Sequence, residues 1–160
     1  MRISRRAAVV VAAVLTGLAS LGAAGAAFAS SSTPRASDGV QVLRLHADIV
    51  DAASNDAGHG GPGDLLAALF AIRTPSGAKA GKESVSLLAI PRHQQLAHSV
   101  FMLKGGQIDA MVSVPESATK FTAAIIGGTG IYEGVTGQIR NVVSASGIDL
   151  TFFIIGPDLH

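Results

Sequence analysis

The sequence predicts an all-β domain, an eight-stranded antiparallel barrel with up-and-down connections, and three observations support this. Short apolar segments recur at even spacing between residues 41 and 155. Turn-forming residues such as Lys104-Gly105-Gly106 and Ser146-Gly147 separate them. The first segment alternates between apolar and polar side chains, as a half-buried strand does. This pattern is typical of barrels and sandwiches, and a closed barrel leaves a mouth for a small ligand.

The individual strands follow from composition and periodicity. Gln41–Val50 alternates residue by residue, which indicates a strand with one buried face. Asp64–Arg73 is ambiguous, because Leu and Ala favour a helix that Asp64 would cap, whereas a strand buried on both faces is equally apolar. Together with Gln41–Val50, this segment brings the number of predicted strands to eight. The remaining six are 84–90, 98–103, 107–114, 121–126, 135–145 and 148–155.

The N-terminal segment has the composition of a cleavable signal peptide. Arg2, Arg5 and Arg6 precede an uncharged apolar stretch, and Ala27-Phe28-Ala29 is a small-residue cleavage site. The alternative is a retained membrane anchor, which needs about 20 predominantly apolar residues. We expect a signal peptide over residues 1–29 with cleavage after Ala29, a disordered leader over 30–39 and a single barrel domain over 40–160. The protein is then secreted and has no membrane contact after cleavage.

Charge and composition exclude several classes of function. The three arginines of the signal peptide leave nine basic residues against eleven acidic ones, without a basic cluster, so we expect no nucleic-acid partner. The chain has no cysteine, which excludes disulfides, thiolate metal sites and a cysteine nucleophile. No histidine spacing is typical of a metal site. We therefore expect no metal and no cofactor.

The most distinctive segment is the glycine-rich stretch 125–137, which holds Gly127, Gly128, Gly130, Tyr132, Gly134 and Gly137. A dinucleotide-binding fingerprint is one interpretation, because Asp149 follows at roughly the distance where such folds place an acid. The third glycine lies one residue too far, the next segment is rich in β-branched residues, and too little chain remains for that fold. We interpret the glycines as a compact connection between two strands, at backbone angles that glycine adopts at little cost.

The same stretch carries a family resemblance. Gly127–Gln138 closely resembles the corresponding segment of plant allene oxide cyclases and the glycine motif of dirigent proteins, which share an eight-stranded, calycin-like barrel. Looser resemblances follow in order along the chain, at His46–Ile49, Gly63–Leu65 and Gly106–Ile108. Together they cover roughly residues 40–155. The resemblance implies that Leu65–Ile72 is a strand and that the protein is a homotrimer, as in both families.

Allene oxide cyclases close an unsaturated fatty-acid epoxide inside the barrel, and the resemblance implies where their site residues fall. The catalytic Glu and its neighbouring Asn correspond to Asp48 and Val50. A second Asn falls near Phe70 and a pocket cysteine near Leu88, which we take as ligand-binding positions. Most of these positions are apolar here, which argues against fatty-acid cyclisation of the plant kind.

Dirigent proteins steer phenoxy-radical coupling or cyclise quinone methides with pocket acids. Asp48 matches their first-strand acid, whereas the next strand offers Ala67 and Ala68 where a second acid would stand. Both resemblances thus point to Asp48. From the alternation alone, His46 lies two residues earlier on the same strand face and could partner Asp48, and Arg44 extends the row as a ligand-binding position.

Two interpretations of this row remain open from the sequence. Inside an apolar barrel, the Asp48 carboxyl has a raised pKa and acts as a general acid or base. Alternatively Arg44, His46 and Asp48 face solvent, and the other face of the strand, Leu43, Leu45, Ala47 and Ile49, fills the barrel.

The resulting functional hypothesis is an exported barrel that binds a small apolar molecule, lipid-like or phenolic, and isomerises or orients it. As an enzyme it would be an isomerase or cyclase of the allene oxide cyclase or dirigent type. The alternative is a non-catalytic secreted barrel that acts as a carrier, a surface protein or an interaction module.

Overall fold

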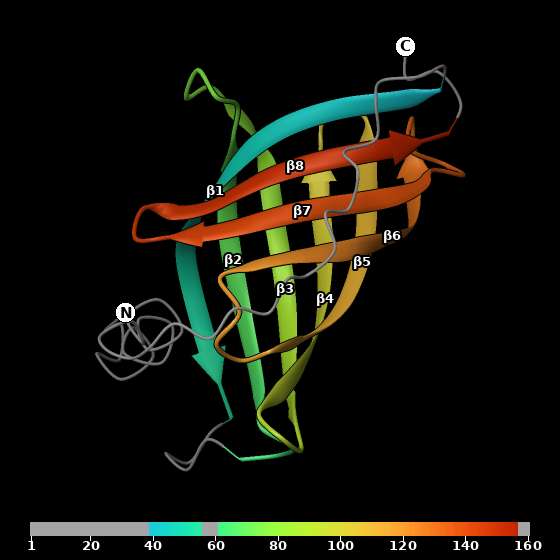
Figure 1. Cartoon of the computed structure of the whole chain (residues 1–160). Coiled ribbons are helices and arrows are strands. Elements are labelled where there is room, and N and C mark those ends of the chain that lie inside the picture. Colours follow the sequence, from blue (N-terminus) through green and yellow to red (C-terminus); the bar gives the residue numbers. More distant parts are fainter. Residues whose placement is uncertain (1–38, 56–60, 157–160) are drawn as a thin grey trace, which may run out of the picture.

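The structure, a computed structural model, describes residues 39–55 and 61–156 (Figure 1). The regular elements in these ranges are strands, and none of the described residues forms a helix long and apolar enough to cross a membrane. The expected signal peptide and all of the expected leader except Gly39 lie outside the described residues. The strands are β1 (Val40–Ser54), β2 (Leu65–Arg73), β3 (Lys79–Ile90), β4 (Gln94–Leu103), β5 (Gly106–Pro115), β6 (Lys120–Gly130), β7 (Thr136–Ser144) and β8 (Gly147–Ile155).

The eight strands form one closed antiparallel barrel in sequence order. Each strand pairs with the next, and β1 closes the sheet on β8, from Val40 opposite Ile155 to Ala47 opposite Ile148. The predicted fold class is therefore confirmed, and the ambiguous segment Leu65–Arg73 is a strand.

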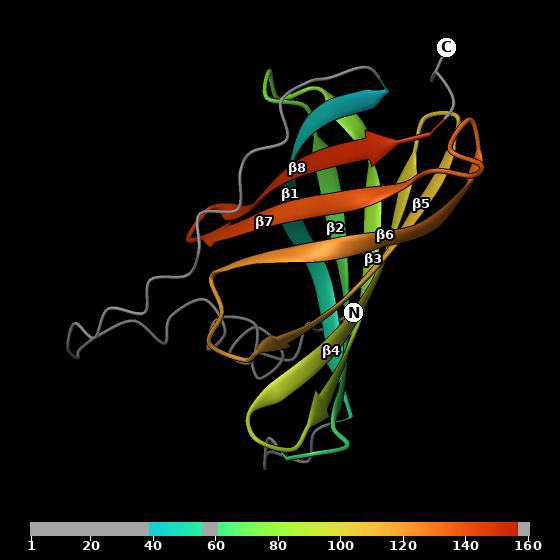
Figure 2. The same cartoon turned by 45° about the vertical axis from the view of Figure 1, so that its right-hand side comes forward.

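The strands do not overlap along their whole lengths, and this opens one end of the barrel. β1 pairs with β8 only as far as Ala47, yet β1 continues along β2 to Ser54. β5 likewise extends beyond Met111, the last of its residues that pairs with β6. Figures 1 and 2 show the consequence: β1 to β5 project as a curved sheet past β6 to β8.

A β-bulge in β1 lies where the strand leaves β8. Ile49 pairs with Phe70 and Asp51 with Leu69, so Val50 is the extra residue in β1. A bulge bends its strand and increases the local twist. The bulge therefore helps to carry β1 from the closed end of the barrel into the projecting sheet.

The closed end holds the hydrophobic core. Phe101 and Phe152 are almost completely buried and meet edge to face, with ring centroids 4.9 Å apart and an interplanar angle of 80°. Aromatic pairs favour this geometry because the positive edge of one ring faces the negative face of the other. Other fully buried side chains around them are Ile72, Ile108, Ile139, Leu150, Ile154 and Val135.

The glycine-rich stretch differs from the predicted connection between strands. Gly127, Gly128 and Gly130 belong to β6 itself, opposite Asp109, Ile108 and Gly106 of β5. The turn is confined to residues 131–135, and Gly137 already lies in β7. The Tyr132 side chain is buried in the core. Backbone atoms approach Gly128, Gly130 and Gly137 too closely for a side chain, so these glycines serve strand packing as well as the turn.

Candidate functional site

A cavity of about 320 Å³ occupies the open end of the barrel. Side chains alternate across each strand, so every second residue faces the interior. The wall is mostly apolar, and all eight strands contribute to it; Leu66, Ala68 and Phe70 of β2 and Val85 and Leu87 of β3 are examples. Its size and apolar lining are those of small-molecule sites, in which a few polar groups set orientation.

Glu83 of β3 is the buried acidic residue of this wall. Its side chain is only 3% exposed, and the flanking strands place Phe70 and Phe101 opposite it. Burial raises the pKa of Glu83 from 4.5 to about 7, and a hydrogen bond from the Ser99 hydroxyl partly opposes the shift. Its Oε2 atom has no hydrogen-bond partner in the part of the chain that the structure describes. A buried polar atom without a partner is uncommon in folded proteins and calls for an explanation.

The chemistry open to Glu83 follows from that pKa. A carboxyl group that titrates near pH 7 is present in both forms under physiological conditions, so it can release a proton or accept one. A strongly shifted pKa caused by desolvation in a cavity is a recognised mark of a functional site. Asn141 of β7 is the other buried polar residue of the wall, and its Nδ2 donates to the Ile139 carbonyl at 3.0 Å.

Sequence reasoning missed Glu83 because the predicted strand began at Ser84, the residue that follows it. β3 starts at Lys79, and its inner face runs through Glu83, Val85 and Leu87. Extending the alternation of Val85 and Leu87 back by two residues would have placed Glu83 on the inner face. That signal was in the sequence, although the polar neighbours Lys82 and Ser84 obscured it.

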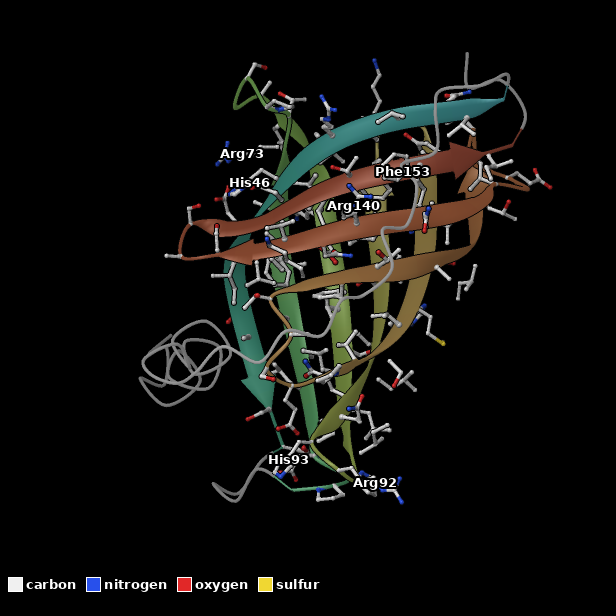
Figure 3. All side chains as sticks on the ribbon, viewed as in Figure 1. His46, Arg73, Arg92, His93, Arg140 and Phe153 are labelled. Carbon is white, nitrogen blue, oxygen red and sulfur yellow. The ribbon has the colours of Figure 1, made fainter. Side chains whose placement is uncertain are left out.

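The row predicted on β1 lies at the outer surface beside the cavity mouth. His46 Nδ1 lies 2.7 Å from Asp149 Oδ1, and its Nε2 lies 3.4 Å from Asp48 Oδ1. Arg73 of β2 donates from Nε to Asp48 Oδ2 at 2.9 Å. Figure 3 shows His46 and Arg73 close together where the middle of β1 passes the β7–β8 turn. Asp48 contributes to the rim of the cavity, while its carboxylate is held by Arg73.

The other face of β1 fills the barrel. Leu45 and Ala47 are buried in the core, Leu43 packs against it, and Ile49 lines the cavity. Arg44 is exposed and does not reach the cavity wall. This arrangement matches the interpretation in which the Arg44, His46 and Asp48 row faces outward.

Asp149→Asn is expected to lower the pKa of His46 toward its ordinary value of 6.5, because the hydrogen bond to Asp149 is the main cause of its rise. A raised histidine pKa stabilises the fold below the ordinary pKa, and that contribution is lost as pH rises through the folded-state value. The variant should therefore be less stable than the wild type only at acidic pH. NMR titration of the His46 ring protons measures the pKa, with exposed Asp51→Asn as the control. An unchanged His46 pKa in Asp149→Asn would contradict the assignment.

Proteins similar to this chain are found among the solved structures. No family model and no curated protein matches the chain. A pyocyanin demethylase superposes with a TM-score of 0.65 at 21% identity, covering 71% of this chain and 99% of the other. An exo-specific intermolecular Diels–Alderase has a TM-score of 0.60 at 11% identity, covering 73% and 98%. A pterocarpan synthase dirigent protein has a TM-score of 0.59 at 14% identity, covering 74% and 95%.

The chain has the fold of the dirigent and cyclase barrels. The expected structural resemblance to dirigent proteins is thus confirmed, while identities this low establish a shared fold alone. The two ligand-binding positions that the resemblance implied, Phe70 and Leu88, lie on opposite faces of this dirigent- and cyclase-like barrel. Phe70 lines the cavity, whereas Leu88 lies on the outer face, 37% exposed and opposite Leu65 and Leu96.

The remaining predicted positions lie away from the cavity. None of the six motif residues, Gly127, Gly128, Gly130, Tyr132, Gly134 and Gly137, belongs to its wall. Among the described residues, no three histidine, aspartate or glutamate side chains gather so that they could hold a metal ion. The site that the structure assembles is therefore the apolar cavity with Glu83 in its wall.

Proposed function

We propose that this barrel binds a small apolar molecule in its cavity and isomerises or cyclises it, with Glu83 as the group that transfers a proton. The observation that carries the proposal is a single buried carboxyl in an apolar cavity, with a pKa raised by burial to about 7. The structural neighbours include a demethylase, a Diels–Alderase and a pterocarpan synthase, which is consistent with chemistry on small organic molecules in this fold.

One carboxyl suffices for an isomerisation. Glu83 as the neutral acid gives its proton to one atom of the bound molecule, and the resulting carboxylate takes a proton from another atom. No net oxidation, reduction or loss of atoms occurs, so no co-reactant is required. The apolar side chains around the buried Glu83, such as Phe70 and Val85, limit the access of water to its carboxyl group, which favours proton transfer between Glu83 and the ligand.

The test compares Glu83→Gln with the wild-type chain over a panel of unsaturated lipids and phenolic compounds. Binding is measured by calorimetry, and conversion by mass spectrometry and NMR. Glutamine keeps the size of glutamate but cannot transfer a proton, so we expect bound ligand with turnover reduced at least about 100-fold. Exposed Glu133→Gln is the matched control and should retain both. Undiminished turnover in Glu83→Gln would exclude the proposed role.

A non-catalytic carrier is the second candidate function, and one observation favours it. The acid to which both family resemblances pointed, Asp48, is held by Arg73 at the outer surface rather than free in the cavity. Ligand binding without conversion of any compound in the panel would support the carrier over the enzyme.

We also propose that the protein is exported after cleavage at Ala29 and assembles as a homotrimer. Export rests on the basic, apolar and small-residue pattern of residues 1–29. Assembly is supported by apolar side chains on the outer face of the barrel, because exposed apolar patches commonly mark interfaces. Leu65, Leu88 and Leu96 form a cross-strand row there, and Met111 and Ile126 are also exposed.

A further inference from the structure

The charges of the cavity wall restrict what can enter it. Among the described residues, its charged members are Asp48 and Glu83, both acidic, and no lysine, arginine or histidine contributes to it. The nearby cations are outside: Arg73 and His46 pair with carboxylates at the outer surface. An anionic ligand would lose its hydration in the cavity without gaining a positive partner, which is strongly unfavourable.

The surroundings of Glu83 favour its neutral form. Phe70 and Phe101 lie opposite it on β2 and β4, and Val85 is the next inward residue of β3. Ser99 supplies its hydrogen bond, and within residues 39–55 and 61–156 Asp48 at the rim is the only other titratable residue of the wall. No positively charged side chain from these ranges lines the wall to stabilise a carboxylate.

A neutral carboxylic acid has one O–H donor, and Glu83 has an oxygen without a partner. The terminal torsion of glutamate is broad and roughly two-fold. The carboxyl can therefore turn its O–H toward a molecule in the cavity without changing the rest of the side chain. A ligand oxygen that accepts this bond would satisfy a group that the protein leaves unsatisfied.

We propose that the ligand is an uncharged apolar molecule whose carbonyl oxygen accepts a hydrogen bond from Glu83, and that the cavity discriminates against carboxylates such as free fatty acids. This inference rests on the proposed function and names the substrate class of the same cavity. It requires only the protein's own proton and no co-reactant.

Matched naphthalene probes test the proposal by calorimetric or fluorescence titration of the full chain. The neutral ketone Prodan is compared with an analogue carrying a carboxylate in place of the propionyl group, with the parent dimethylaminonaphthalene and with an aminomethyl analogue. At pH 6 we expect the ketone to bind about five-fold more tightly than the parent, the effect of one hydrogen bond. The carboxylate should bind at least about 100-fold more weakly than the ketone, because a buried anion lacks a partner.

Two variants and the pH assign the preference to Glu83. Between pH 6 and pH 8.5 the advantage of the ketone over the parent should disappear in the wild type as Glu83 ionises. In Glu83→Gln the amide still donates, so the preference should persist and become independent of pH. Glu83→Leu should bind ketone and parent equally, while Glu133→Gln should behave as the wild type. Thermal melting confirms that each variant is folded before titration.

The outcomes separate the inference from the proposed function. Tight binding of the carboxylate, or a ketone preference that survives in Glu83→Leu, overturns the inference and leaves the binding function standing. Tightest binding of the aminomethyl probe, increasing with pH, also overturns it, because Glu83 would then act as an anionic anchor. If no probe binds in any form, the cavity is not a binding site for molecules of this size, and the proposed function is rejected as well.

Discussion

Glu83→Leu is expected to raise the free energy of unfolding at pH 8 by about 3 kcal/mol relative to the wild type. Burial raises the pKa of Glu83 from 4.5 to about 7, and each pKa unit corresponds to about 1.4 kcal/mol. At pH 8 the folded wild type must hold a carboxylate among Phe70, Phe101 and Val85. Leucine removes that cost and fills similar space with an apolar side chain.

The sign of the pH dependence follows from the raised pKa. The folded chain holds the Glu83 proton more tightly than the unfolded chain, so this stabilisation is complete below pH 4.5 and is lost as pH rises through about 7. The wild type should therefore lose stability over that interval, and the difference between wild type and Glu83→Leu should grow. Urea unfolding followed by circular dichroism at pH 4.5, 6, 7 and 8 measures both curves.

Subtracting the two curves isolates Glu83, because His46 titrates in both proteins. Exposed Glu133→Gln is the control and should parallel the wild type at every pH. If the Glu83→Leu curve also runs parallel to the wild type, then Glu83 is solvated and ionised in the folded state. That result would remove the physical basis of the proposed proton transfer.

A carboxyl group that destabilises the fold at physiological pH needs a compensating role. Replacing such a group with an apolar residue of similar size is commonly neutral or stabilising. Strained or poorly solvated groups of this kind gather at functional sites, where activity offsets their effect on stability. The stability experiment with Glu83→Leu and the turnover experiment with Glu83→Gln therefore both test the raised pKa of the buried Glu83 carboxyl.

The fold could be predicted because its signal is local and repeated. Each strand and turn carries its own signal in the sequence. Examples are the alternation in β1, the glycine turn Lys104-Gly105-Gly106 and the segments rich in β-branched residues. The ambiguous segment Leu65–Arg73 shows the limit of periodicity. Its helix-favouring Leu and Ala are overridden by pairing with β1 and β3, and only the family resemblance indicated that outcome beforehand.

The site was harder to predict because it depends on which face of each strand turns inward. Asp48 has the expected residue type at the expected place, yet it reaches only the rim of the cavity, where Arg73 holds its carboxylate. Glu83 lies on the inner face because β3 begins five residues before the predicted strand. The register of a strand is set by its partners, and one residue of offset exchanges its two faces. The β1 bulge at Val50 is likewise a product of pairing and has no sequence signal of its own.

Gly128→Ala is expected to destabilise the barrel by about 3 kcal/mol or more, whereas Gly127→Ala should change stability by less than about 0.5 kcal/mol. A Cβ at Gly128 would clash with the Tyr132 carbonyl oxygen and would lie 2.7 Å from that of Gln107. Both are backbone atoms and cannot move aside without disturbing the β5–β6 pairing. A Cβ at Gly127 meets nothing within 4 Å.

The two adjacent glycines thus separate a structural motif from a functional one. Unfolding midpoints in urea and the Prodan affinity of both variants provide the measurements. If the motif serves backbone packing, Gly128→Ala loses stability and Gly127→Ala retains both stability and binding, since neither residue lines the cavity. If the motif instead serves a ligand, Gly127→Ala should lose binding while remaining folded. If both substitutions are tolerated equally, then β6 does not approach β5 and Tyr132 as closely as in the structure. The assignment of a structural role to the motif would then be wrong.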